Sequence, residues 1–212
     1  NLGVELGFLN GMIDLQLDYF DERRKDIFMP RESVPMTAGF MKQPWKNFGK
    51  VTNQGVEVTL NVNKQFGKDL FVSLMGTFTY AHNEITEKDE PSAVVGTNRA
   101  ETGHPVGQLT GYIAEGLFTV DDFEDVSTGK LKEGIPTQSF VGKLRPGDIR
   151  YRDVNGDGKV DVFDKSPIGG TKDPEIVYGF GLNMKYKNLD FGALFQGIGR
   201  SWNILGSSII PG

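Results

Sequence analysis

The sequence predicts an all-β protein made of long antiparallel hairpins, and three features of residues 53–81 indicate this fold. Apolar and polar residues alternate along both arms of this stretch, so each arm has one apolar and one polar face. The residues between the arms include Gly67, which suits a hairpin turn. Each arm runs for ten residues or more, longer than the ~5–6 residues of a typical soluble strand and about as long as a tilted membrane-spanning strand needs to be.

Composition narrows the class of protein. A net charge of −5 and an isoelectric point near 5.1 argue against a nucleic-acid partner, which needs a basic surface. The absence of cysteine excludes a disulfide framework and thiol chemistry. No apolar run reaches the roughly 18 residues that a membrane-spanning helix requires. Membrane-spanning strands escape that criterion, because their hydrophobicity is spread over every second position.

Residues 2–20 form the first predicted hairpin. Alternating segments flank the dipeptide Asn10-Gly11, which is the strongest short hairpin signal. Successive strand side chains point to opposite faces. The acidic residues of this hairpin therefore share its polar face; they are Glu5, Asp14 and Asp18.

Residues 21–46 break the alternation and are predicted to form a loop. The segment begins with a charged run and carries several prolines, which weaken strand pairing. A third strand is expected near residues 45–64, and the fourth strand is expected to end around His82-Asn83.

Residues 84–174 are a long irregular insert, rich in proline and glycine. Only short extended runs such as 111–118 and 148–151 interrupt it. A structureless connection of this size counts against a compact domain unless it is a functional loop. Alternation resumes over residues 178–196 around a tight turn at Lys187-Asn188, which predicts a third hairpin.

The connections between strands sort into two groups. Turns near residues 10, 67 and 188 are short, whereas those at 21–46 and 84–174 are long. Because consecutive strands alternate in direction, all short turns lie at one end of the sheet and all long loops at the other. Outer-membrane barrels have this arrangement, with the long loops outside the cell. Aromatic residues near both strand ends fit the girdles of such barrels, although aromatics favour strands in general.

The sequence therefore predicts an antiparallel transmembrane β-barrel fragment of about six spanning strands with one long extracellular loop. Residues 1–83 would hold barrel hairpins and the loop 21–46, and residues 84–174 would form the long extracellular loop. Residues 175–212 would be a hairpin and the start of the next extracellular loop. Because the chain begins inside a strand-like pattern, we interpret it as part of a longer protein.

A soluble β-sandwich is the alternative interpretation. A sheet with one buried face also alternates apolar and polar residues. Arm length, the asymmetry of the loops and the small polar residues of the polar face favour the membrane instead. In the sandwich interpretation, the chain is a soluble, calcium-stabilised protein that binds carbohydrate or another protein.

Residues 153–164 fit the twelve-residue calcium loop, with Asp164 where the last position usually has Glu. Oxygen ligands at alternating positions can wrap a cation, and Gly158 permits the sharp turn that the loop needs. A turn cluster of Asp, Asn and Gly without a metal is the alternative. We expect a structural Ca²⁺ rather than a sensor. The predicted ligands are Asp153, Asn155, Asp157, Lys159 through its carbonyl, Asp161 and Asp164.

Catalytic constellations are lacking, and no enzyme is predicted. Only His82 and His104 could act as imidazole bases, and neither lies in a nucleophile motif such as G-x-S-x-G. The paired glycines near residues 179–181 and 197–199 are too short for a phosphate-binding fingerprint.

The chain resembles the C-terminal part of SusC/RagA-like TonB-dependent outer-membrane transporters. The resemblance is carried by the motif NFGKVTNQGVE, by the ending GYIAEGLF of a second block and by the run PGDIRYRDVNGDG. Two further blocks extend from Ile168 to Phe180 and from Leu189 to Gly197. These blocks are spread over nearly the whole chain, and their order and spacing make the match specific.

This resemblance implies a barrel of roughly 22 strands closed around a plug. The whole protein would lie among outer-membrane lipids and be energised through TonB, which contacts an N-terminal part absent from this chain. A SusD-like surface lipoprotein would cover the extracellular mouth, and the substrate would be a glycan or a peptide. The insert 84–174 would help to meet that lipoprotein, and the calcium site would keep the insert in shape.

Polar residues of the strands would line the lumen, near the plug or the path of the solute. Most of them would only face water inside the barrel or hydrogen-bond the plug, and no substrate contact can be assigned to any of them. The predicted lumen-facing residues are Glu5, Asp14, Asp18, Glu57, Asn61, Asn63, Asn183, Lys185, Asp190 and Gln196.

Overall fold

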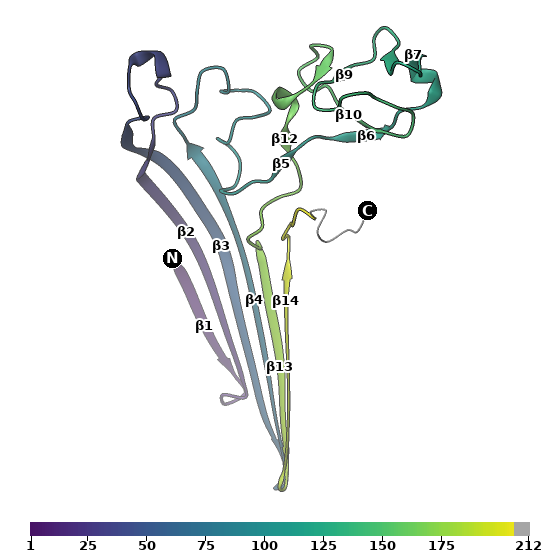
Figure 1. Ribbon diagram of the computed structural model, residues 1–212. Helices are drawn as coiled ribbons and strands as arrows, with labels where there is room; N and C mark the ends of the chain where they lie inside the picture. The colour runs from purple at the N-terminus through teal and green to yellow at the C-terminus, as the bar shows by residue number, and fades with distance from the viewer. Residues whose placement is uncertain (206–212) are drawn as a thin grey trace.

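The computed structural model describes residues 1–205, and its main feature is one six-stranded antiparallel sheet. Neighbouring strands of the sheet are also neighbours in sequence, except that the insert separates β4 from β13. In Figure 1 the sheet is a tall, curved wall that carries the insert at its upper end. The strands are β1 (Leu2–Phe8), β2 (Ile13–Pro30), β3 (Trp45–Phe66), β4 (Leu70–Glu87), β13 (Ile176–Tyr186) and β14 (Leu189–Gly199).

The predicted all-β class and the three predicted hairpins are confirmed. The short turns all lie at the lower end of the sheet in Figure 1. Backbone angles explain why these sequences turn. Asn10 and Gly11 have φ of 58° and 78°, and Gly67 has φ of 64°. Glycine and asparagine adopt this left-handed region at the lowest cost, and tight hairpin turns require it.

The loop predicted for residues 21–46 is shorter than expected, which corrects the sequence-based boundary. β2 continues to Pro30 and β3 begins at Trp45, so the connection spans residues 31–44 and contains a short 3₁₀ helix, η1 (Met36–Ala38). The charged run lies inside β2 because both faces of the strand meet solvent there. β4 likewise continues to Glu87, beyond the predicted end near Asn83.

The charges of the upper part of β2 are accommodated by neighbours on the same face of the strand. Arg23 pairs with Asp21 at 3.0 Å, and Arg24 lies 3.7 Å from Glu22. A bulge between Arg24 and Ile27 then shifts the register, and Asp26 takes a positive φ of 55° at this point. Bulges of this kind increase the local twist of a strand.

The insert between β4 and β13 is folded rather than structureless. Its strands form four two-stranded sheets, and its hydrophobic core consists of Phe118, Phe123 and Leu144. None of the helices in residues 1–205 has the length and hydrophobicity of a membrane-spanning helix. The elements of the insert are β5 (Thr110–Gly111), β6 (Ala114–Leu117), η2 (Val120–Asp122), β7 (Phe123–Asp125), β8 (Lys130–Leu131), β9 (Thr137–Gln138), β10 (Ile149–Tyr151), β11 (Lys159–Val160), η3 (Val162–Asp164) and β12 (Ser166–Pro167).

The apolar face of the main sheet is not covered by a second layer of the described residues. The other sheets in residues 1–205 have two strands each and belong to the insert. On this face, Leu60 of β3 is 39 % exposed and Phe191 of β14 is 54 % exposed. A sandwich would bury such side chains between two sheets. The buried apolar residues are instead gathered in the insert and at its junction with β4, where Ile85 is 8 % exposed. The end of the predicted segment 175–212 lies outside the described residues from 206 onward.

Candidate functional site

The register of the main sheet separates its two faces row by row. Residues directly opposite each other on antiparallel strands lie on the same face. One row that crosses all six strands is polar or glycine, and it runs Glu5, Gln16, Thr59, Thr77, Gly179, Gln196. The next row toward the short turns is apolar, and it runs Leu6, Leu15, Leu60, Gly76, Phe180, Phe195.

All ten residues predicted to line a lumen lie on this polar face. Asp14 is opposite Asn61, and Asp18 is opposite Glu57. Farther along the sheet, Asn63 is opposite Ser73, which is opposite Asn183, and Lys185 is opposite Asp190. A few apolar side chains, such as Met75 and Leu194, share the face. The register thus confirms the shared face, whereas its contact with a lumen stays a prediction.

The polar face carries an acidic patch on its first three strands. The patch consists of Glu5, Asp14, Asp18 and Glu57, and Gln16 Nε2 donates a hydrogen bond of 2.9 Å to Asp18 Oδ2. An open cavity of about 430 Å³ lies along it and is lined by side chains such as Asn61. Carboxylates and carboxamides are acceptors and donors for sugar hydroxyls and peptide groups.

A segment of the insert lies beside the upper end of β4, and we call residues 103–108 the overhang. Gly103 N donates to Ile85 O at 2.8 Å, and Ile85 N donates to His104 O at 2.9 Å. Val106 N then donates to Asn83 Oδ1 at 2.7 Å. Asn83 is opposite Asn53 in the sheet, four residues before Glu57 on the same face. The overhang therefore pairs with the free edge of β4 where β4 extends past β13, and its Val106 reaches Asn83 on the polar face.

Sequence reasoning did not select Arg24, Asn53 and Asn83 as candidate residues. They line a second cavity, of about 300 Å³, together with Val106 of the overhang and Asp173. The alternation that placed Glu57 on the polar face could have found Asn53, because strand side chains repeat every second residue. The overhang itself has no signal in the sequence, because hydrogen bonds between distant segments create it.

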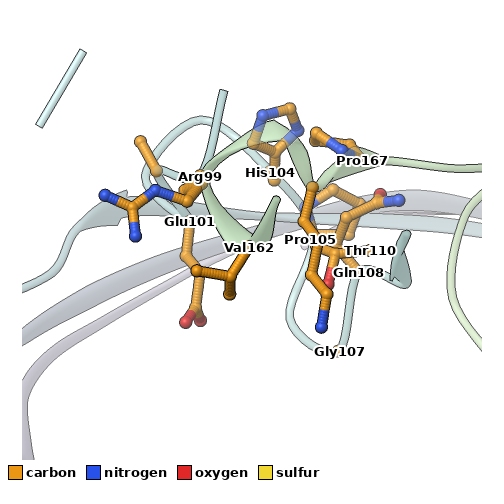
Figure 2. A pocket seen from close by; sticks show the side chains of 11 residues that line it. Arg99, Glu101, His104, Pro105, Gly107, Gln108, Thr110, Val162 and Pro167 are labelled. Atoms are coloured by element: carbon orange, nitrogen blue, oxygen red, sulfur yellow. The ribbon is translucent and has the colours of Figure 1, made fainter. Parts of the chain in front are cut away.

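A third cavity, of about 320 Å³, also has residues of the overhang in its lining. Figure 2 shows lining side chains of this cavity, among them Arg99, Glu101 and His104 from the segment before β5, Val162 of η3 and Pro167 of β12. The wall also includes Gln108, whose Nε2 donates to Leu109 O at 2.9 Å and thereby holds the amide in place. The remaining lining residues are Ala100, Pro105, Gly107, Thr110 and Lys165.

The segment that follows β4 is hydrogen-bonded both to loop 31–44 and to the rest of the insert. Asp89 is almost fully buried and accepts hydrogen bonds from Arg31 Nε at 2.8 Å and from Ser33 Oγ at 2.7 Å. Burial by itself would raise the pKa of the Asp89 carboxyl, but the hydrogen bonds from Ser33 and Arg31 outweigh burial and lower this pKa. The neighbouring Glu90 accepts from the amide of Glu101 at 2.5 Å. Loop 31–44 is thus fastened to the insert.

His82 and His104 lie in different surroundings. His82 Nδ1 lies 2.5 Å from Glu175 Oε1, and Arg200 Nη1 lies 3.1 Å from the other oxygen of Glu175. This cluster joins the upper ends of β4, β13 and β14. His104 is part of the overhang and of the cavity in Figure 2.

The predicted calcium loop is closed by hydrogen bonds from its own backbone. Asp153 accepts from the amides of Gly156 and Gly158, at 2.7 and 2.8 Å. Asp157 Oδ1 accepts from the Lys159 amide at 2.9 Å. These bonds are the turn-stabilising pattern of Asp and Asn side chains.

Asp164, at the last position of this loop, is completely buried. Its Oδ1 accepts from Val154 N at 2.8 Å, and its Oδ2 accepts from Asp161 N at 2.7 Å. In residues 1–205, no three acidic, histidine or cysteine side chains lie together in a group that could hold a metal ion. A cation in this loop would have to replace backbone N–H groups as the partner of Asp153 and Asp164. The calcium site stays a prediction.

Comparisons with known proteins agree with this geometry. A wall of long antiparallel strands with one apolar and one polar face is the architecture of a section of a large β-barrel. Residues 1–201 match the family model described as TonB dependent receptor-like, beta-barrel. The chain belongs to this family.

The relatives point to the SusC/RagA branch. The TonB-dependent receptor SusC of Bacteroides thetaiotaomicron is 28 % identical over 207 residues, which cover 90 % of this chain and 18 % of SusC. TonB-dependent receptor P3 of Formosa agariphila is 24 % identical over 92 % of this chain and 19 % of that receptor. The resemblance to SusC/RagA-like transporters is therefore confirmed.

A solved structure shares the fold. The RagAB peptide importer in its closed-closed state superposes with a TM-score of 0.64 at 21 % identity, covering 94 % of this chain and 20 % of that one. The open-open state of the same importer gives the same TM-score of 0.64. The chain spans about a fifth of the length of the relatives it matches.

Proposed function

We propose that this chain is part of the barrel wall of an outer-membrane importer that takes up oligosaccharides or peptides. TonB would supply the energy through a part of the protein outside this chain, and a SusD-like surface lipoprotein would close the mouth. The observation that carries the proposal is the division of a six-stranded sheet into one apolar and one largely polar face. Family membership supports the outer membrane as the location.

Each face has a role in this proposal. The apolar face would meet lipid, because the exposed side chains of its strands are aliphatic and aromatic over its whole width. The polar face would border the water-filled lumen and the plug. The insert and loop 31–44 lie together at one end of the sheet (Figure 1), which is where a lipoprotein lid would be met.

The soluble sandwich is the weaker candidate. It requires a second layer of protein over the apolar face, and residues 1–205 provide none. It would also leave the family match without an explanation. The import function accounts for both.

The substrate class is the finer part of the proposal. RagAB is described as a peptide importer. The polar face offers carboxylates and carboxamides, which bind sugar hydroxyls and peptide groups equally well. We therefore propose both substrate classes, and the uptake assay described next distinguishes between them.

The proposal is tested by uptake in cells that produce the full-length protein and its lipoprotein. A set of fluorescent oligosaccharides and a set of fluorescent peptides serve as probes. We expect one set to enter the periplasm only when TonB is present, and entry to fall when the lipoprotein gene is deleted. Equal uptake in the absence of TonB, for every probe that enters, would refute active import.

A bound Ca²⁺ in residues 153–164 is a separate proposal, supported by the spacing of the oxygen ligands. The ion would be held by Asp153, Asn155, Asp157, the carbonyl of Lys159, Asp161 and Asp164. Its role would be to keep the insert rigid.

A further inference from the structure

The cavity in Figure 2 contains cationic side chains that lack an acidic partner. Among the described residues, neither Arg99 nor Lys165 makes an ion pair, although both line the cavity. The guanidinium of Arg99 stacks on the ring of Phe163, with its carbon 4.6 Å from the ring centroid. Stacking uses the face of the guanidinium and leaves its N–H groups free to donate. Nη2 donates a long hydrogen bond of 3.5 Å to Ala93 O, and the other N–H groups have no partner among the described residues. Lys165 Nζ lies 5.6 Å from the centroid of the Tyr112 ring.

The acidic side chain of the same cavity has a cationic partner. Glu101 accepts a hydrogen bond of 2.7 Å from Lys88 Nζ, and Lys88 is largely buried. Lys88 Nζ also lies 3.7 Å from Glu32 Oε1, so it offsets only part of the negative charge of Glu101. With Arg99 and Lys165 unpaired, the cavity has a positive charge in a protein whose net charge is −5.

The remaining wall suits an organic ligand rather than a free ion. Val162, Pro105 and Pro167 form apolar surface, and Gln108 and Thr110 supply polar groups. The Gln108 amide nitrogen is held by the carbonyls of Leu109 and Ile168, at 2.9 and 3.3 Å. The carbonyl oxygen of this side chain thus remains the end that can accept from a ligand.

The cavity and the second cavity both have lining residues in the overhang. His104 and Gln108 line the cavity. Val106, between them in sequence, lines the second cavity and is hydrogen-bonded to Asn83 on the polar face. The overhang therefore connects the cavity to the polar face.

We propose that this cavity binds a carboxylate group of an acidic solute on its way to the polar face. Arg99 and Lys165 would supply the charge, His104 a ring N–H, and the prolines the apolar contact for the body of the solute. The inference rests on the proposed import function and names the chemistry of the solute. Either an acidic sugar or an acidic peptide would carry the required group.

The test measures binding to the purified full-length transporter with its lipoprotein. The sugar probes are tri-galacturonate and its neutral methyl ester. The peptide probes are triglutamate and triglutamine, both acetylated at the N-terminus and amidated at the C-terminus, so that only the side chains differ in charge. We expect one acidic probe to bind at least about tenfold more tightly than its neutral counterpart, a difference that falls as salt is raised. The acidic probe that binds identifies the source of the carboxylate.

The variant Arg99→Gln combined with Lys165→Gln should lower the affinity for that acidic probe about tenfold or more. Lys187→Gln, in a short turn at the opposite end of the sheet, is the matched control and should change nothing. Single variants are used if the double variant fails to reach the outer membrane.

Unchanged acidic-probe affinity in the double variant, or equal binding of acidic and neutral probes, would overturn the inference. The inference would also be overturned if the double variant no longer bound the lipoprotein but still bound the acidic probe. The cavity would then be a contact surface for the lipoprotein. These outcomes leave TonB-dependent uptake of a neutral probe untouched, whereas failure of that uptake would count against the import function itself.

Discussion

At the scale of single residues, two glycines of the main sheet differ in the space around them. At one of them another group occupies the place of a side chain. Gly55 of β3 lies under the ring of Phe20, and a Cβ atom there would collide with this ring and with the carbonyl of Tyr80. An aromatic ring over a strand glycine covers backbone that would otherwise be bare. Gly76 of β4 has no neighbour within 4 Å of a Cβ position. The two glycines therefore predict opposite responses to the same substitution.

We expect Gly55→Ala in the full-length barrel to cost about 1–3 kcal/mol, because the added methyl forces the ring and the neighbouring strand apart. Gly76→Ala, the matched control, should be neutral or slightly stabilising. Urea unfolding of the refolded barrel, followed by tryptophan fluorescence, measures both. Equal midpoints for the two variants would contradict this account of Gly55.

Asp89 predicts a dependence on pH. Its folded-state pKa is lowered, so its contribution to stability is complete above the unfolded value of about 3.9 and is lost as pH falls through the folded pKa. The fastening of loop 31–44 should therefore persist at pH 5 and weaken only in strong acid. Asp89→Asn should loosen it at neutral pH, because Arg31 loses its charged partner.

Hydrogen exchange at Ser33 reports this fastening, since the Ser33 amide donates to Asp89 at 3.2 Å. We expect faster exchange in Asp89→Asn by a factor that corresponds to about 1–3 kcal/mol. Asp190→Asn on β14 is the control. Identical exchange at Ser33 in the variant and the parent protein would show that the contact is not maintained in solution.

At the scale of elements, two adjacent residues of β3 lie on opposite faces of the sheet and would contact different surroundings. Leu60 lies on the apolar face and Thr59 on the polar face. If the apolar face meets lipid, Leu60→Arg should cost about 2–4 kcal/mol near the bilayer midplane. Thr59→Arg should cost little, because its side chain would enter the lumen.

The fraction of heat-modifiable, folded barrel in outer membranes measures both arginine variants. Similar folded fractions would argue that the apolar face does not contact lipid. A spin label at position 60 gives a second readout, and free access of water to a label in the folded barrel would lead to the same conclusion.

The loop 153–164 is an element whose function depends on an ion. Calorimetry with the full-length protein should detect calcium binding at millimolar concentration or below. Asp153→Asn combined with Asp157→Asn should abolish it, and Asp190→Asn should not. Absence of any heat in the parent protein would leave the loop as a turn closed by its own hydrogen bonds.

At the scale of the whole molecule, the sheet has two open edges. Among the described residues, β1 and β14 each pair on one side only. Open edges and an uncovered apolar face both promote association. We expect residues 1–212, produced alone in water, to aggregate and to require detergent. Size-exclusion chromatography tests this, and a monodisperse monomer without detergent would favour the soluble alternative.

Alternation predicted most of the sheet. The period of two assigns faces to residues such as Glu57 and Val58 directly, and the register then aligned all the predicted polar residues on one face. The same signal failed in residues 21–30, where charges on both faces conceal a strand. Composition cannot distinguish a loop in water from a strand with water on both sides.

The extended runs predicted at 111–118 and 148–151 correspond to β6 and β10, which pair with each other. The other contacts within the insert were beyond sequence reasoning for a different reason. Its cavities and the overhang are produced by contacts between distant segments, such as Asn83 with Val106 and Leu109 with Gly170. Trp202 packs against Gly169 and Gly170, within 2.7–2.8 Å of the positions a Cβ would occupy, although it follows β14. No local sequence pattern predicts these contacts.

The sequence by itself thus determined the strands, their two faces and the family, because side-chain alternation is a local property of the backbone. Only the tertiary structure decided how far the strands extend and where the overhang pairs with β4. It also decided which cations lack a partner. Those properties depend on backbone hydrogen bonds and ion pairs between residues far apart in the chain, which local alternation does not encode.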